Sequence, residues 1–143
     1  MNEKYMNIAI KQAEKAYKKN EVPIGAVIVK NNKIIAKAYN KKEKTKTVTK
    51  HAEIIAIEKA CKKLKTWHLN DCELYTTVEP CLMCSGAIIQ SRIKKVYCAT
   101  KNEKFGELNN IVSNYNLKIK IQYGLLKDKS VQLLQKFFNQ KRK

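Results

Sequence analysis

Apolar residues near the start of the chain recur at helical spacing, which predicts an amphipathic helix over residues 3–19. Pro23 ends this pattern. A short β-branched run from Ile24 to Val29 then predicts a strand, and the pair Asn31-Asn32 predicts a turn. The segment from Lys33 to Tyr39 returns as a second strand, so the first third of the chain is expected to form a helix and a hairpin.

The rest of the chain alternates between helical and strand patterns. After a polar loop over 40–50, we expect a helix over 51–64, a strand over 74–78, and a helix that begins at Pro80 and continues over 82–89. Strands are expected over 96–99 and 117–123. A final helix should carry Val131, Leu134, Phe137 and Phe138 on one face. Helix–strand alternation favours parallel pairing with helices on the faces of a sheet, and the hairpin makes that sheet mixed. No linker or repeat divides the sequence, so residues 1–143 are predicted to be one domain.

The composition narrows the class of protein. Hydrophobic residues make up 44% of the chain, too many for a disordered protein. There is no apolar run of about 18 residues and no secretory signal pattern, so we expect a cytoplasmic protein without a membrane partner. The five cysteines, an odd number, indicate reduced thiols or metal ligands rather than a disulfide framework.

The net charge of +18 is typical of proteins with a polyanionic partner such as RNA. The basic residues are almost all lysine, however, and asparagine is frequent, as an AT-rich genome would produce for any function. Charge alone therefore leaves nucleic-acid binding open.

Two short motifs carry the chemistry. His51-Ala52-Glu53 begins one predicted helix, and Pro80-Cys81-Leu82-Met83-Cys84 begins the next. Cys81 and Cys84 share a helix face in the first turn, where unpaired N–H groups favour the thiolate form that binds metal. With neutral His51 they make three protein ligands, and a three-ligand zinc site leaves one position for water.

Such a zinc ion lowers the pKa of its water to roughly 7. A carboxylate beside that water can shuttle protons, and Glu53 is the candidate for this catalytic role. His-x-Glu together with Pro-Cys-x-x-Cys is the signature of zinc deaminases that act on nucleobases. The alternatives for Cys81 and Cys84 are a pair of buried structural thiols or half of a structural zinc site. A structural site needs a fourth protein ligand, from Cys72, Cys98 or His68. Cys61, Cys72 and Cys98 are more simply core residues, and His68 a surface or packing residue beside Trp67.

At these motifs the chain resembles the bacterial tRNA-specific adenosine deaminases. The resembling segments are Val22–Val27, Asn40, His51–Glu53, Thr66–Leu69, Leu74–Ala87, Ser91–Ile93 and the C-terminal Phe137-Phe138 with its basic residues. Cytidine, guanine and riboflavin-pathway deaminases share the zinc motif. The stretch Met-Cys-x-Gly-Ala that leads to Ser-Arg-Ile points specifically to the tRNA enzymes, and so does the terminal Phe-Phe segment with its basic residues.

The resemblance implies a three-layer α/β/α fold of the cytidine deaminase type with a mixed five-stranded sheet. It also implies a homodimer with one Zn²⁺ per chain, and conversion of adenosine to inosine at the wobble position of an arginine tRNA by attack of zinc hydroxide on C6. By position, Asn40 and Asn102 resemble substrate-binding residues. Ile24 resembles a wall of the base pocket and equally suits the core of a strand. The residues implied to bind RNA are Phe137, Phe138, Lys141, Arg142 and Lys143.

The chain departs from the family at three places: Lys50 before the metal histidine, Asn102 in place of the usual aspartate, and a shorter segment after Gly106. Lys50 could reach phosphate, and Asn102 could merely cap a turn. Two rival functions stay open. One is a deaminase of free guanine or another small base, which would not need the basic C-terminal helix. The other is a non-catalytic RNA-binding subunit, which typically lacks the carboxylate that Glu53 supplies.

Overall fold

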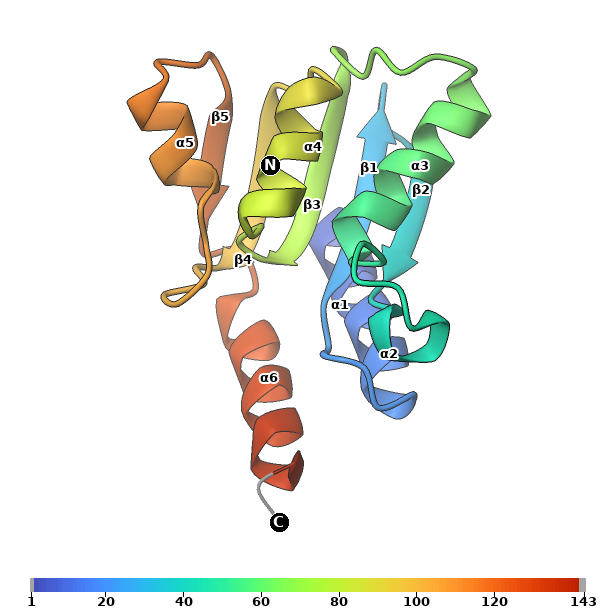
Figure 1. Ribbon diagram of the computed structural model, residues 1–143, viewed down its shortest axis with the longest axis vertical. Helices are drawn as coiled ribbons and strands as arrows, with labels where there is room; N and C mark the ends of the chain where they lie inside the picture. The colour runs from blue at the N-terminus through green and yellow to red at the C-terminus, as the bar shows by residue number, and fades with distance from the viewer. Residues whose placement is uncertain (1, 142–143) are drawn as a thin grey trace.

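The computed structural model describes residues 2–141, which form a five-stranded sheet between helices (Figure 1). The elements, in chain order, are α1 Glu3–Lys18, β1 Gly25–Lys30, β2 Lys33–Tyr39, α2 Lys42–Thr45, α3 Ala52–Leu64, β3 Cys72–Val78, α4 Leu82–Gln90, β4 Lys95–Thr100, α5 Leu108–Asn114, β5 Lys120–Tyr123 and α6 Lys127–Lys141. Arg142 and Lys143, two of the residues expected to bind RNA, lie outside the described residues.

The sheet has the strand order β2-β1-β3-β4-β5 and is mixed, as predicted. β1 pairs antiparallel with both β2 and β3, whereas β4 runs parallel to β3 and to β5. The hairpin turn closes through Asn31 and Asn32, both of which have positive φ (50° and 61°). Asparagine tolerates this left-handed backbone better than most residues, so the hairpin follows from the local sequence.

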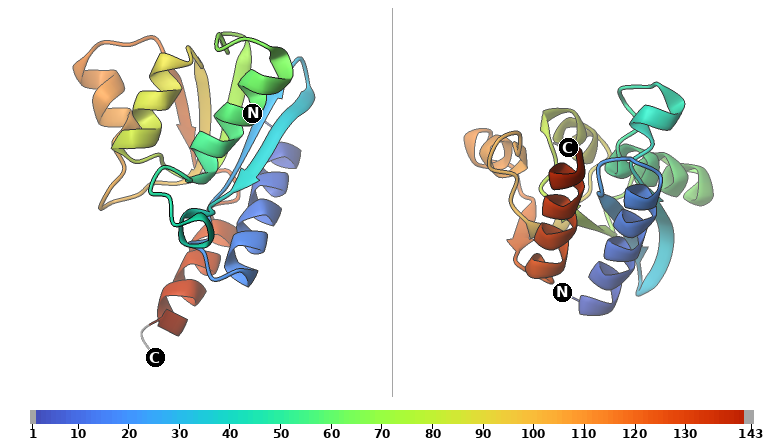
Figure 2. Two further views of the ribbon diagram at one scale, coloured as in Figure 1. Left: turned by 45° about the vertical axis from the view of Figure 1, so that its right-hand side comes forward. Right: turned by 90° about the horizontal axis from the view of Figure 1, so that it is seen from below.

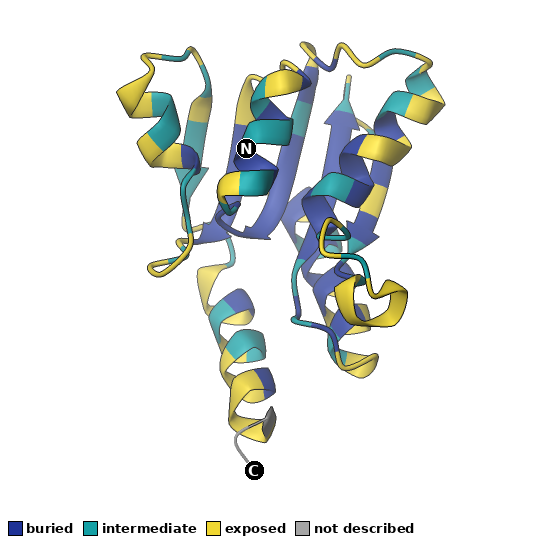
Figure 3. Cartoon of the chain, viewed as in Figure 1, coloured by how far each residue is buried: buried dark blue, intermediate teal, exposed yellow. Residues whose placement is uncertain are grey.

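Helices cover both faces of the sheet, in the three layers that were expected (Figure 2). α3, α4 and α5 lie on one face, over a core that includes Ile28, Leu74 and Val96, and α1 lies on the other face with α6 beside it. Burial follows these layers, because the central strands are buried along most of their length whereas the outer surface of α6 is exposed (Figure 3). Gly25 lets α1 approach β1 closely, since a Cβ there would collide with the backbone oxygen of Ala9.

Three features of the secondary structure differ from those that the sequence predicts. The stretch 40–50 is not wholly a loop, because it contains the short helix α2. Two backbone N–H groups of α2 donate hydrogen bonds to the side chain of Glu21, which lies far away in the sequence. Pro80 is not the first helical residue, because α4 begins at Leu82 and Cys81 is its N-cap. The predicted strand 117–123 is shorter, and α5 precedes it in a segment for which no element was predicted. No helix in the described part of the chain is long and apolar enough to cross a membrane.

Candidate active site

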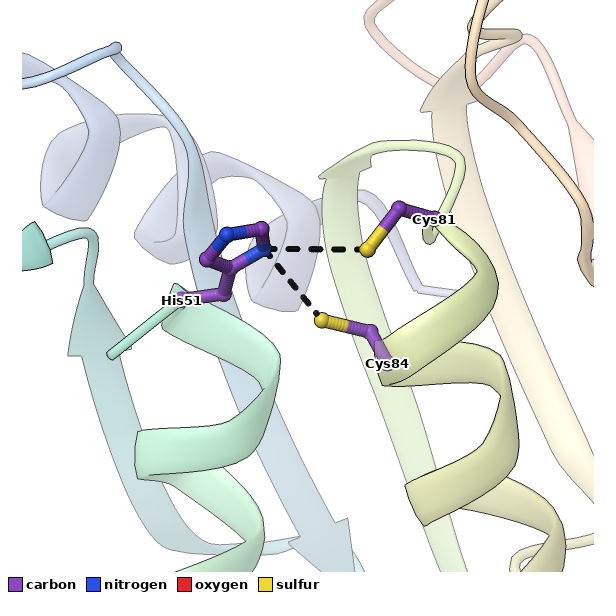
Figure 4. A group of neighbouring side chains, drawn as sticks. All are labelled: His51, Cys81 and Cys84. Carbon is purple, nitrogen blue, oxygen red and sulfur yellow. Dashed lines mark hydrogen bonds between the residues drawn. The ribbon is translucent and has the colours of Figure 1, made fainter. Parts of the chain in front are cut away.

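The topology of the sheet brings the two sequence motifs together. β2 and β3 both run antiparallel to β1, so both end at the same edge of the sheet. α3 follows β2 through the α2 segment, and α4 follows β3 directly, so the N-termini of both helices lie at this edge. His51 is the N-cap of α3 and Cys81 is the N-cap of α4. Two motifs some thirty residues apart thereby face each other (Figure 4).

His51, Cys81 and Cys84 form one compact group of donor atoms. Nδ1 of His51 lies 3.7 Å from Sγ of Cys81 and 3.6 Å from Sγ of Cys84. Ordinary zinc bond lengths in a tetrahedral site place a nitrogen and a sulfur ligand about 3.6 Å apart, so the group fits zinc. Among residues 2–141, this is the one group of three or more histidine, cysteine or acidic side chains placed to hold a metal ion. No fourth protein donor belongs to this group, so the geometry does not support a structural zinc site among these residues.

The three donor groups are coupled to one another. Hydrogen bonding from the Cys84 thiol lowers the pKa of Cys81 to about 3, and His51 adds to this effect. The same bond to Cys81 raises the pKa of the buried Cys84 well above its usual range, and desolvation adds to the rise. The hydrogen bond with Cys81 also raises the pKa of His51. The site thus already favours one thiolate, and a bound dication would favour the second, because metal binding displaces ligand protons.

Glu53 lies in the first turn of α3 and is buried, with only 3% of its surface exposed. Its Oε1 atom has no hydrogen-bond partner, although native proteins pair nearly all buried polar atoms. Desolvation raises the pKa of this carboxyl to about 7. A buried carboxyl with an unpaired oxygen beside a metal-binding group is placed to exchange protons with a ligand.

A cavity of about 680 Å³ opens onto this group. His51, Glu53 and Cys81 line it, together with Asn40 and Ile24. Its volume lies within the range of about 300–1,000 Å³ of small-molecule sites. The structure thus brings both predicted base-pocket residues to the cavity, and Ile24 also packs against the core as the alternative required.

Asn102 lines the same cavity, and its side chain also closes a turn. Oδ1 of Asn102 accepts hydrogen bonds from the backbone N–H groups of Phe105 (3.0 Å) and Lys104 (3.3 Å). Its own backbone N–H donates to Oε1 of Glu79 at 3.3 Å. The turn-capping role is therefore present in the structure, on the rim of the cavity.

Among the residues of the cavity wall that the sequence analysis did not predict are Glu21, Glu79 and Phe105. Glu21 is buried and accepts hydrogen bonds from the backbone N–H groups of Glu43 and Lys44, at 3.0 and 2.7 Å, which anchors α2. Glu79 accepts a 2.8 Å hydrogen bond from the hydroxyl of Tyr123. Both glutamates directly precede a recognised motif, Val-Pro and Pro-Cys, and this adjacency was the available signal.

The remaining predicted residues have different surroundings. Phe137 is buried against Tyr17 of α1, with ring centroids 6.4 Å apart, whereas Phe138 is 46% exposed and lines the cavity. Lys50 pairs with Glu58 at 3.1 Å. His68 stacks on Trp67 at the surface, as expected, and Cys72 and Cys98 are buried core residues.

Comparison with known proteins places this site in a family. A family model described as MafB19-like deaminase matches residues 1–142. The tRNA-specific adenosine deaminase of Aquifex aeolicus is 42% identical, over 98% of this chain and 95% of its own length. The enzyme of the same name from Bacillus subtilis is also 42% identical, over 99% of this chain and 91% of its own.

Solved structures agree. One comes from work on A-to-I editing by tRNA:A34 deaminases at the wobble position of transfer RNA, and it matches with a TM-score of 0.89 and 33% identity, over 93% of this chain and all of that one. A guanine deaminase from Nitrosomonas europaea matches with a TM-score of 0.85 and 27% identity, over 96% of this chain and 84% of that one. The cavity with its His-Cys-Cys group is thus found in a chain similar to deaminases along nearly its whole length.

Proposed function

The chain belongs to the tRNA-specific adenosine deaminases, and from this membership we propose that it hydrolyses adenosine to inosine at the wobble position of a tRNA anticodon. The observation that carries the proposal is the meeting of His51, Cys81 and Cys84 with the unpaired carboxylate oxygen of Glu53 at one cavity. This arrangement supports an enzyme rather than a non-catalytic RNA-binding subunit.

The metal is proposed to be zinc, one ion per chain. Two thiolates and an imidazole are a typical donor set for zinc, and the two nitrogen–sulfur distances agree with tetrahedral geometry. When bound, a zinc ion supplies Lewis acidity that makes hydroxide available near neutral pH.

The protein groups then have separate roles. Hydrolytic deamination adds one water across the N1–C6 double bond of adenine and then breaks the bond from C6 to the exocyclic nitrogen, which leaves as ammonia. One proton of the water must therefore reach N1, and the other must reach the departing amino group. Glu53 is proposed to carry both protons, because its buried oxygen faces the cavity without a competing partner. Asn40 and Ile24 are proposed to hold the adenosine in the cavity.

The finer features follow from the same family membership. We propose the arginine tRNA as substrate, a homodimer as the assembly and the cytoplasm as the location. Phe138 on the cavity wall and the C-terminal residues Lys141, Arg142 and Lys143 are proposed to contact RNA, whereas Phe137 supports α6 against α1.

One experiment tests the function. The purified protein is incubated with an anticodon stem-loop of the arginine tRNA, and the wobble position is examined for inosine. A stem-loop with guanosine at that position is the negative control. Free guanine is assayed in parallel, because the similarity to guanine deaminases makes that reaction the second candidate. Inosine in the stem-loop without turnover of free guanine is expected, and the reverse result would reassign the enzyme.

A further inference from the structure

Exposed apolar side chains concentrate at the mouth of the cavity. The large hydrophobic residues with high exposure in the described part of the chain are Val48, Trp67, Leu82, Phe105, Tyr115 and Phe138. Val48, Phe105 and Phe138 all line the cavity of the metal group. They come from three separate segments: the loop before α3, the turn before α5, and α6. This convergence marks the cavity mouth as a surface for a ligand with apolar faces.

Phe105 is held in place by its own turn. Oδ1 of Asn102 accepts the Phe105 N–H, and the backbone oxygen of Asn102 accepts the N–H of Gly106 at 2.9 Å. A Cβ on Gly106 would lie 2.6 Å from the backbone oxygen of Asn102, so only glycine lets the turn pack this closely. The Phe105 side chain nevertheless stays 61% exposed. A fixed turn that presents an exposed ring loses little entropy when a ligand binds.

The charges at the mouth suit RNA. Lys42 and Lys104 are exposed and line the cavity, and the Lys104 ammonium lies 5.4 Å from the centre of the Phe105 ring. Glu21 and Glu79 also line it, but hydrogen bonds to their neighbours occupy both carboxylates, and Glu43 is the one exposed acidic residue of the lining. Aromatic faces beside lysines are what proteins use to bind single-stranded nucleic acid.

We propose that Phe105 stacks on the nucleobase next to the reacting adenosine and so holds the single-stranded loop of the RNA at the cavity. The proposal rests on the function proposed above and adds a binding position for a second nucleotide. Phe105 is distinct from Asn40 and Ile24, which are proposed above to hold the reacting adenosine, because it stands on the exposed turn at the rim.

The test measures binding without turnover, in a Glu53→Gln background. Anticodon stem-loops carry the fluorescent base 2-aminopurine on one side of the wobble adenosine or on the other. Quenching is expected at one of the two positions, and Phe105→Ala should abolish it and weaken binding about 5- to 100-fold, as expected for one lost base stack. Phe105→Tyr should restore both. Tyr115→Ala, which removes an exposed aromatic outside the cavity lining, is the matched control and should change neither.

A second RNA decides the interpretation. Replacing the quenched nucleotide by an abasic one should remove the difference in affinity between Phe105 and Phe105→Ala. If the difference persists on the abasic RNA, the ring does not stack on that base and the proposal is wrong. The proposal is also wrong if Phe105→Ala changes the sedimenting mass of the free protein, because the ring then belongs to an interface between copies of the chain. If the unmodified protein deaminates the stem-loop but Phe105→Ala binds it equally well, the stacking proposal fails alone. If the unmodified protein yields no inosine, the proposed function fails first.

Discussion

The side-chain oxygen of Asn40 accepts a hydrogen bond from the backbone N–H of Ala52, at 2.7 Å. Ala52 is the first residue of α3, and His51, the N-cap, makes no side-chain capping bond of its own. The residue directly after β2 therefore caps α3, which follows His51 and carries Glu53. The same side chain lines the cavity, so Asn40 connects the cavity wall to the helix that carries Glu53.

This link predicts a difference between two substitutions. Asn40→Ala leaves the buried Ala52 N–H without a partner, so the free energy of unfolding should fall by about 1–3 kcal/mol. Asn40→Asp keeps an acceptor oxygen and should retain most of that stability, while turnover falls in both variants because the carboxamide N–H₂ is lost. Urea unfolding of metal-loaded protein gives the first quantity and deamination kinetics the second. Equal stability of Asn40→Ala and the unmodified protein would contradict the capping role.

Replacing one thiolate should remove the metal. Cys84→Ala leaves two protein ligands, and we expect the zinc content to fall from about one ion per chain to near zero, with loss of activity. The control is Cys61→Ala, because Cys61 is a free cysteine outside the metal group and should not alter zinc content. Elemental analysis measures both variants. A full complement of zinc in Cys84→Ala would remove Cys84 from the ligand set.

Glu53→Gln should separate metal binding from turnover. The glutamine side chain has nearly the same size as that of glutamate, and Glu53 is not among the three metal donors, so fold and zinc content should be kept. Turnover should fall at least about 100-fold, the usual effect of losing a general acid–base group. Single-turnover rates on the anticodon stem-loop check this. Near-normal rates would exclude Glu53 as the proton carrier.

The C-terminal basic residues are expected to bind phosphate. A chain that ends after Gln140 lacks Lys141, Arg142 and Lys143, and it should bind the tRNA more weakly and with a smaller salt dependence, because fewer counterions are released. Affinity measured at several salt concentrations gives the slope. An unchanged slope would mean that these residues stay in solvent when tRNA binds.

Asn102 is expected to affect the choice between RNA and DNA. An aspartate at this rim position could also accept the N–H groups of Lys104 and Phe105, so Asn102→Asp should keep the turn while adding a negative charge. A carboxylate near the nucleic-acid backbone accepts a hydrogen bond from a ribose 2′-OH, and it repels phosphate where that bond is missing. It therefore disfavours DNA as a substrate, because the 2′-OH is the group that distinguishes RNA from DNA. We therefore expect weak deamination of adenine in single-stranded DNA of anticodon-loop sequence by the unmodified protein. The ratio of rates on matched RNA and DNA hairpins should rise in Asn102→Asp. The same ratio in both proteins would leave turn capping as the whole role of residue 102.

The sequence alone determined the features that depend on neighbours in the chain. Asn31 and Asn32 specify the hairpin because their local backbone favours positive φ, and the spacing of Cys81 and Cys84 puts both thiols at one helix end. Periodicity located every strand and all helices but α2 and α5, with small errors at the ends. The short helix α2 has no such local signal, since the buried carboxylate of Glu21, more than twenty residues earlier, holds it.

Only the tertiary structure decided which side chains meet. Phe137 and Phe138 are adjacent and chemically identical, yet Phe137 packs against Tyr17 whereas Phe138 lines the cavity. They differ because neighbouring residues on a helix point in directions about 100° apart. His51 reaches the two cysteines only because β2 and β3 end at the same edge of the sheet. Glu21 and Glu79 adjoin recognised motifs, but they and Phe105 reach the cavity for the same reason. Strand order and loop packing set the contacts between residues far apart in the chain, and no local pattern encodes those contacts.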